Sequence, residues 1–243
     1  METVGVQSLD TKPAMPYLTF LDESATFHRA IAYLISVHIS VLQKTDSQVA
    51  EAHDRLASKV APVYKDPRSY FVARLFIAHV AAFEYFLQDM IGEVIRKCPK
   101  KVGDVEFRLA DILDSSSTKE LIDRASDAHL NRLMYKKPSE YLKEVCSLLS
   151  IEKAPLEEDW RILVEAKARR DLGVHNAWKC NGIYLRKMQE AGVSTNLNQG
   201  DSAAPQEKSY LDRVTDALDS LAKRISHAVL SKHWPELGGL VTV

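Results

Sequence analysis

The segment from residue 67 to 97 constrains the fold of this chain more than any other. Its apolar residues recur at helical spacing and cover more than one face of a helix. They are Phe71, Val72, Leu75, Phe76, Val80, Phe83, Phe86, Leu87, Met90 and Ile91. Pro67 suits the first turn of such a helix. We therefore predict a helix that is central to the core, or shared between the core and a subunit interface.

The rest of the chain also follows helical spacing, and no segment alternates as a strand would, so the sequence predicts an all-α fold. A helix capped by Asp22 or Ser24 should run to Leu42. Further helices are expected at about 47–60, 104–113, 118–135, 139–149, 157–175 and 207–230. Residues 192–205 lack periodicity and are expected to be a mobile loop before the last helix.

One compact unit with three parts is the domain organisation that these segments indicate. Residues 1–17, with two prolines and little periodicity, are expected to form an extended lead-in. Residues 18–66 hold the N-terminal helices, and residues 67–243 form the main helical domain. The apolar fraction of 46% is ample for a core of this size.

Charge and composition exclude several classes of protein. The net charge of −1 gives no overall field for nucleic acid or membrane, so a polyanion would need a local patch. Residues 160–190 supply one, with seven Lys or Arg against three Asp or Glu. The three cysteines form no Cys-x-x-Cys pair, and no signal peptide or membrane span is recognised, so we expect a reduced, cytoplasmic protein without membrane contact. Zinc and P-loop motifs are absent, and we expect no metal ion and no cofactor.

An Arg and a His separated by four residues occur three times, so this spacing alone selects no site. Arg74 and His79 lie in the apolar segment and are interpreted as packing residues. Arg124 and His129 lie among evenly spread polar residues and are interpreted as surface residues. Arg170 and His175 differ from both pairs, because a polar residue directly follows each of them. This third pair is the candidate site.

The sequence Arg-Arg-Asp-x-x-Val-His-Asn at 169–176, followed by Asn-Gly-Ile-Tyr-Leu at 181–185, resembles the HEPN superfamily of small all-α proteins. It is closest to a prokaryotic branch of toxin and defence ribonucleases. A second match is the apolar helix segment 81–89 with its acidic residue Glu84. Together these features cover roughly residues 67–230. The resemblance implies a HEPN-like antiparallel helical bundle, here with extra N-terminal helices.

Members of this family typically dimerise so that two motifs converge on one cleft. On a regular helix Arg170 and His175 lie about 140° apart, which makes a poor site in one chain unless the helix frays at Gly173. The resemblance therefore implies a homodimer. It also implies a metal-independent endoribonuclease that uses the 2′-hydroxyl of its RNA substrate, in a toxin or phage-defence effector with an antitoxin or another defence-system protein as a possible partner.

Each polar residue of the motif has an expected role. Arg170 would stabilise the charge on phosphate, and His175 would transfer protons. Asp171 would orient Arg170 or His175, and Asn176 would hold phosphate or cap the helix end. RNA-binding cations would be Lys167, Arg169 and Lys179. A buried carboxylate needs a partner, so Glu84 would form either a structural salt bridge or a support for the site around Arg170.

Two alternatives stay open at this point. The chain can be a non-catalytic dimeric helical module that binds a nucleotide or a partner protein, as some family members are. It can also be an antitoxin target that is silenced by modification of a neighbouring tyrosine such as Tyr184. Ala177-Trp178 departs from the small or Gly-bearing segment that usually follows His-Asn, and this departure affects the expected shape of the groove.

Overall fold

A computed structural model describes residues 10–43, 47–61, 63–64, 66–103, 112–134 and 136–241. Within these ranges the chain is helical and contains no β-strand apart from one isolated bridge between Lys179 and Ser202. The prediction of an all-α fold is therefore confirmed.

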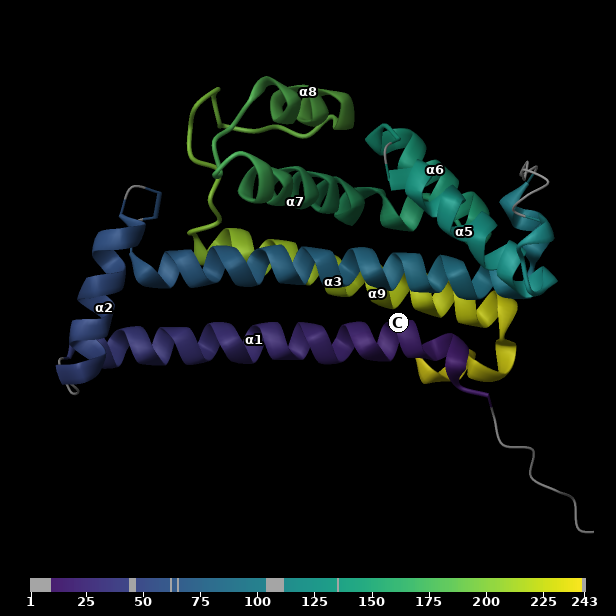
Figure 1. The fold of residues 1–243 in the computed structure, drawn as a ribbon, viewed down its shortest axis with the longest axis horizontal. Helices are drawn as coiled ribbons and strands as arrows, with labels where there is room; N and C mark the ends of the chain where they lie inside the picture. The colour runs from purple at the N-terminus through teal and green to yellow at the C-terminus, as the bar shows by residue number, and fades with distance from the viewer. Residues whose placement is uncertain are drawn as a thin grey trace, which may run out of the picture.

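Three long helices lie side by side and form the body of the molecule (Figure 1). They are α1 (Met15–Leu42), α3 (Pro67–Lys97) and α9 (Lys208–His233). α1 runs antiparallel to α3, and α2 (Ser47–Val60) crosses at one end to join them. α9 packs against both α1 and α3, so α3 is surrounded by other helices.

The candidate motif lies on a second layer above this body (Figure 1). α7 (Glu157–His175) packs against α3 and α9, and α8 (Gly182–Ala191) lies on the outer side of α7. α5 (Thr118–Met134) and α6 (Pro138–Leu149) lie together at the other end of α3. Short 3₁₀ turns complete the described chain at Lys12–Ala14, Pro99–Val102, Ala154–Leu156 and Pro235–Leu240.

α3 is the central core helix that its apolar pattern predicts. It begins where expected, because Pro67 occupies its first turn and Asp66 accepts a hydrogen bond from the Ser69 amide at 2.7 Å. Nearly all of its predicted apolar residues are buried; Phe71 differs, at 42% exposed. By length and composition α3 alone among the described helices could cross a membrane, and half of its most apolar stretch is buried in the fold.

The N-terminal segment differs from the predicted extended lead-in. Residues 1–9 lie outside the described part, but the chain is helical from Lys12 and α1 begins at Met15. Asp22 and Ser24 therefore lie within α1 and do not cap it. The Ser24 hydroxyl instead donates to Asp219 Oδ1 at 2.7 Å and joins α1 to α9.

Most of the other predicted helices are present, with ends shifted by a few residues. The helix predicted at 104–113 lies mainly outside the described residues. Residues 183–189, for which we predicted no helix, belong to α8, and Asn181 caps this helix by accepting from the Tyr184 amide at 3.0 Å.

Residues 192–205 lack a helix, as predicted, but backbone hydrogen bonds fix the end of this segment. The Ala203 amide donates to the Trp178 carbonyl at 2.7 Å, and the Cys180 amide donates to the Asp201 carbonyl at 2.9 Å. Ala203 and Pro205 are buried. These contacts do not favour the mobility that we expected for this segment.

Candidate functional site

The motif closes helix α7 without fraying. α7 continues through Gly173 to His175, and the amides of Asn176 and Trp178 then donate to the Leu172 carbonyl at 2.9 and 3.0 Å. The Asn176 side chain donates from Nδ2 to the Lys179 carbonyl at 2.6 Å. Asn176 thus occupies the C-cap position of α7 through its backbone amide, and its side chain holds the turn that follows the helix.

Trp178 anchors the turn that follows the motif. Ala177 and Trp178 adopt left-handed backbone conformations, with φ of 46° and 64°. The indole is buried and donates from Nε1 to the Tyr64 hydroxyl at 2.8 Å. Its ring lies over Gly173, where a β-carbon would come within 2.5 Å of Trp178 Cη2. Gly173 thus gives the ring room to pack, and it does not interrupt the helix.

A surface hollow of about 480 Å³ lies beside the motif, between α7 and α8. Arg170 and His175 both line it, even though they are five residues apart on a continuous helix. Lys167 and Asp171 from α7 and Lys187 from α8 line the same hollow. A single chain therefore brings the two principal motif residues to one hollow, which the helical geometry alone did not lead us to expect.

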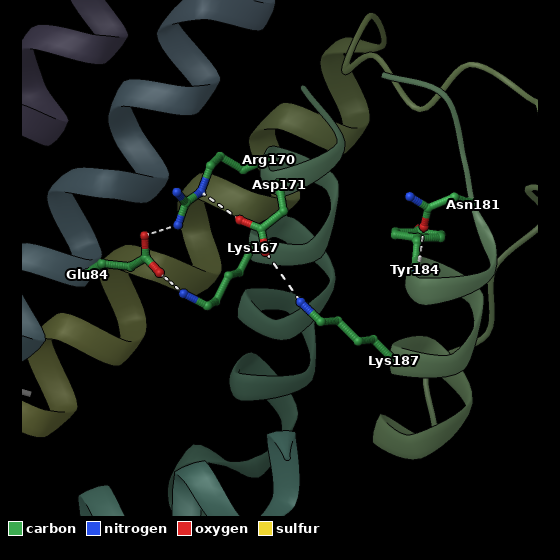
Figure 2. Close-up of polar contacts among 7 residues, drawn as sticks. All are labelled: Glu84, Lys167, Arg170, Asp171, Asn181, Tyr184 and Lys187. Atoms are coloured by element: carbon green, nitrogen blue, oxygen red, sulfur yellow. Dashed lines mark hydrogen bonds and ion pairs between the residues drawn. The ribbon is translucent and has the colours of Figure 1, made fainter. Parts of the chain in front are cut away.

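Figure 2 shows a series of alternating charges that runs from Glu84 on α3 through α7 to Lys187 on α8. All of its members except Glu84 line the hollow. The Glu84 carboxylate, from α3, receives Lys167 Nζ on one oxygen and Arg170 Nη2 on the other. Asp171 continues the series, with Oδ1 3.5 Å from Arg170 Nε and Oδ2 3.3 Å from Lys187 Nζ. The prediction that Glu84 has a partner is thus confirmed, and the partner is a pair of cations. The ion pair is both buried and directly attached to Arg170, so both expected roles of Glu84 remain.

The two halves of this series of charged side chains differ in their access to solvent. The Glu84 carboxylate is buried, and the Arg170 side chain is only 18% exposed. Asp171 and Lys187 are 33% and 39% exposed, and His175 lies at the surface. The guanidinium of Arg170 therefore contributes a fixed positive charge, whereas Lys187 and His175 are accessible.

Arg169 has a different environment from the one predicted. Its Nε donates to Glu165 Oε1 at 2.7 Å, and its guanidinium lies 4.1 Å from the centre of the Tyr210 ring. Burial acts to lower the pKa of Arg169, but Tyr210 and Glu165 outweigh it, so the pKa is raised. Arg169 serves the interior and is not part of the hollow. Lys179 has an exposed side chain, but it does not line the hollow either.

The Tyr184 hydroxyl is not available for modification in this structure. Tyr184 is buried, and its hydroxyl donates to Glu165 at 2.9 Å, beside the Tyr210 hydroxyl at 2.6 Å from the same carboxylate. Burial, followed by the negative charge of Glu165, raises the pKa of Tyr184. Tyr184 is one of the residues that line the hollow, but it is only 2% exposed. Of the neighbouring tyrosines that this alternative allows, Tyr184 itself therefore has a hydroxyl that is engaged in the interior.

The other two Arg and His pairs behave largely as interpreted. His79 is buried and stacks on Phe27, with ring centres 4.4 Å apart, so it serves packing as interpreted. Arg74 departs from that interpretation, because it is exposed and lies 5.3 Å from the centre of the Tyr70 ring. Arg124 is at the surface and pairs with Glu120 at 2.7 Å. His129 departs from the surface interpretation, because it lies 3.2 Å from Glu144 between α5 and α6 with a side chain only 15% exposed.

Lys187 is a charged residue of the hollow to which the sequence analysis assigned no individual role. It lies on α8, twelve residues after His175, and meets the motif only through the packing of two helices. The signal that could have located it was the Asn181 cap, which starts a helix carrying Tyr184 and Lys187 three positions apart. Both residues line the hollow.

Comparison with known proteins returned no matching protein-family model, no matching curated protein and no matching solved structure. In the described ranges, no group of three or more His, Cys, Asp or Glu side chains is arranged to hold a metal ion.

Proposed function

We propose that this protein is a metal-independent endoribonuclease of the HEPN type, with a composite site where two copies of the chain meet. The observation that carries the proposal is the shared hollow, because Arg170 and His175 line it together with Lys167 and Lys187. Such a surface suits a phosphodiester better than a neutral ligand. The resemblance of the motif to the HEPN superfamily supplies the reaction class.

In this mechanism the 2′-hydroxyl of the RNA attacks the adjacent phosphorus, and the bond to the 5′-oxygen of the next nucleotide breaks. His175 of one copy accepts the proton of the 2′-hydroxyl, and His175 of the second copy donates a proton to the leaving oxygen. Arg170, held by Glu84, stabilises the negative charge that develops on the phosphoryl oxygens. The products are a 2′,3′-cyclic phosphate and a 5′-hydroxyl.

The second copy has an apolar surface on which it could dock. Ile183, at the start of α8, lines the hollow and is 57% exposed, and Val174 is exposed directly before His175. Apolar side chains at the rim of a charged hollow support an interface around it. The role as a cytoplasmic toxin or phage-defence effector, with an antitoxin or other defence-system partner, rests on the resemblance alone.

Cleavage of a mixed RNA substrate by the purified protein tests the proposal. We expect His175→Ala to abolish cleavage while leaving the melting temperature unchanged, because the side chain is exposed. His28→Ala, at another exposed histidine, is the matched control and should retain activity. The products should carry 2′,3′-cyclic phosphate ends, and EDTA should have no effect. A 5′-phosphate product, or a strict need for magnesium, contradicts the mechanism.

One observation favours a second candidate function. Arg170 is engaged by Glu84 and flanked by Asp171, so its charge is already balanced in the single chain. This arrangement suits a non-catalytic dimeric module that binds a nucleotide or a partner protein. Binding of a nucleotide, unchanged in His175→Ala and without any cleavage of RNA, would identify the protein as a nucleotide-binding module of this kind.

A further inference from the structure

In the outer half of the charged series in Figure 2, the Asp171 carboxylate lies between two cations, Arg170 and Lys187, as a bound anion would. We infer that the carboxylate of Asp171 occupies the place of a substrate phosphate, which displaces it and is then held by Lys187 and Arg170 Nε. This inference rests on the proposed function, because it specifies how the same hollow receives the phosphodiester.

The contacts of Asp171 are weaker than those of the neighbouring carboxylate. Its oxygens lie 3.5 Å from Arg170 Nε and 3.3 Å from Lys187 Nζ, at or beyond the usual range for a charge-assisted hydrogen bond. Glu84, in contrast, makes close contacts with both of its cations. The inner pair is therefore the fixed part of the site, and Asp171 is the part that a ligand can replace.

The Nε atom of Arg170 supplies an independent observation. It is fully buried and has no hydrogen-bond partner, although Asp171 is its nearest carboxylate. A buried N–H without a partner is unfavourable, and an oxygen at hydrogen-bond distance would satisfy it. A phosphate has several oxygens in a tetrahedral arrangement, so one oxygen can reach this N–H while another contacts Lys187.

Access to this position depends on Asp171 turning aside. Asp171 is 33% exposed and lies on the outer face of α7, so its side chain can rotate toward solvent. Lys187 comes from α8 and has no other ion pair among the described residues. Once Asp171 is displaced, the inner Arg170 and Lys167 still share Glu84, and the site gains the charge of Lys187 for the incoming anion.

Binding of a fully 2′-O-methylated RNA oligonucleotide tests this inference, because this probe lacks the attacking hydroxyl and cannot be cleaved. We expect Asp171→Asn to tighten binding by about threefold, since the competing carboxylate is removed. Lys187→Met should weaken binding by about tenfold. It should also reduce the slope of log affinity against log salt by about 0.7, the value for one phosphate contact on a single strand.

Two matched controls change the same charge outside the hollow. Glu190→Gln reproduces the charge change of Asp171→Asn, and Arg186→Met reproduces that of Lys187→Met; both residues are exposed on α8. Each control should stay within about twofold of the parent protein. The inference is overturned if Asp171→Asn weakens binding or matches Glu190→Gln, if Lys187→Met matches Arg186→Met, or if the oligonucleotide does not bind.

Cleavage of unmodified RNA, measured on the same proteins, separates this inference from the proposed function. The expected binding pattern without cleavage supports the anion site and rejects the ribonuclease. Cleavage without the binding pattern supports the ribonuclease and rejects the role of Asp171 described here.

Discussion

Gly173 and Trp178 are packed so closely that no side chain fits between them, because a β-carbon at residue 173 would lie 2.5 Å from Trp178 Cη2. We therefore expect Gly173→Ala to destabilise the protein by about 2 kcal/mol, although alanine normally favours a helix. Gly92→Ala in α3 is the matched control, since a β-carbon there makes an ordinary contact at 3.5 Å with the flexible Arg96 side chain. It should stabilise by up to about 1 kcal/mol. Urea unfolding measures both changes, and equal effects would contradict the close packing.

Glu84 should be essential for stability because it neutralises two largely buried cations. Glu84→Gln leaves Lys167 and Arg170 without their shared countercharge, and we expect a loss of about 3 kcal/mol in the free energy of unfolding. Asp89→Asn, an exposed residue on the same helix, should change stability by less than about 0.5 kcal/mol. Chemical denaturation at neutral pH makes the comparison. A neutral effect of Glu84→Gln would show that the ion pairs add nothing to the fold.

His79 should make the protein sensitive to acid. Burial, with a smaller contribution from the charge of His28, lowers the pKa of His79 to about 4, whereas an unfolded histidine titrates near 6.5. Between about pH 6.5 and about pH 4 the folded state therefore binds fewer protons than the unfolded state. The contribution of neutral His79 to the free energy of unfolding is fully present above about pH 6.5, and about 3 kcal/mol is lost as the pH falls to about 4.

The His79→Phe variant tests this pH dependence. Both ring nitrogens of His79 are buried without hydrogen-bond partners, and the ring stacks on Phe27, so phenylalanine should fit without loss at neutral pH. Urea midpoints at pH 7 and pH 4.5 should differ less in the variant than in the parent. An unchanged difference would assign the acid sensitivity to other groups.

The buried carboxylate of Glu165 should depend on its two tyrosine donors. Tyr210→Phe and Tyr184→Phe each remove one hydroxyl that donates to Glu165, and each should cost about 2 kcal/mol. Tyr85→Phe, at an exposed tyrosine, should have no effect. Thermal melting of the three variants is sufficient. If Tyr184→Phe behaved like Tyr85→Phe, the Tyr184 hydroxyl would be at the surface and open to modification after all.

Long helices with clear local signals were predictable from the sequence. Pro67 and Asp66 start α3, and the acidic residues at 157–159 mark the positive end of α7. The start of α1 was missed because Pro13 and Pro16 favour an extended interpretation, yet proline is also tolerated in the first turn of a helix. Local sequence does not separate these two uses of proline.

The composition of the site was only partly predictable, because it depends on which way neighbouring side chains face. Arg169 and Arg170 are adjacent, but about 100° of helical rotation sends one to Glu165 and the other to Glu84. That choice is set by α3 and α9, which are far away in the sequence. Lys187 likewise reaches the hollow only after α8 has packed on α7. The motif therefore predicted the central residues of the site, whereas its other residues are determined by the packing of helices that are distant in the sequence.

The bridge between Lys179 and Ser202 closes the segment that contains α8 into a loop whose two ends lie together. The chain leaves the end of α7, forms α8, and returns to the place that it left, where the two arms are hydrogen-bonded together. The residues between these two ends form a closed loop, so replacing them would not alter the path of the chain from α7 to α9. The ligand preference of the hollow could therefore be changed by replacing this loop with a different sequence. Tyr184 and Met188 would have to be kept, because their side chains are buried against the interior.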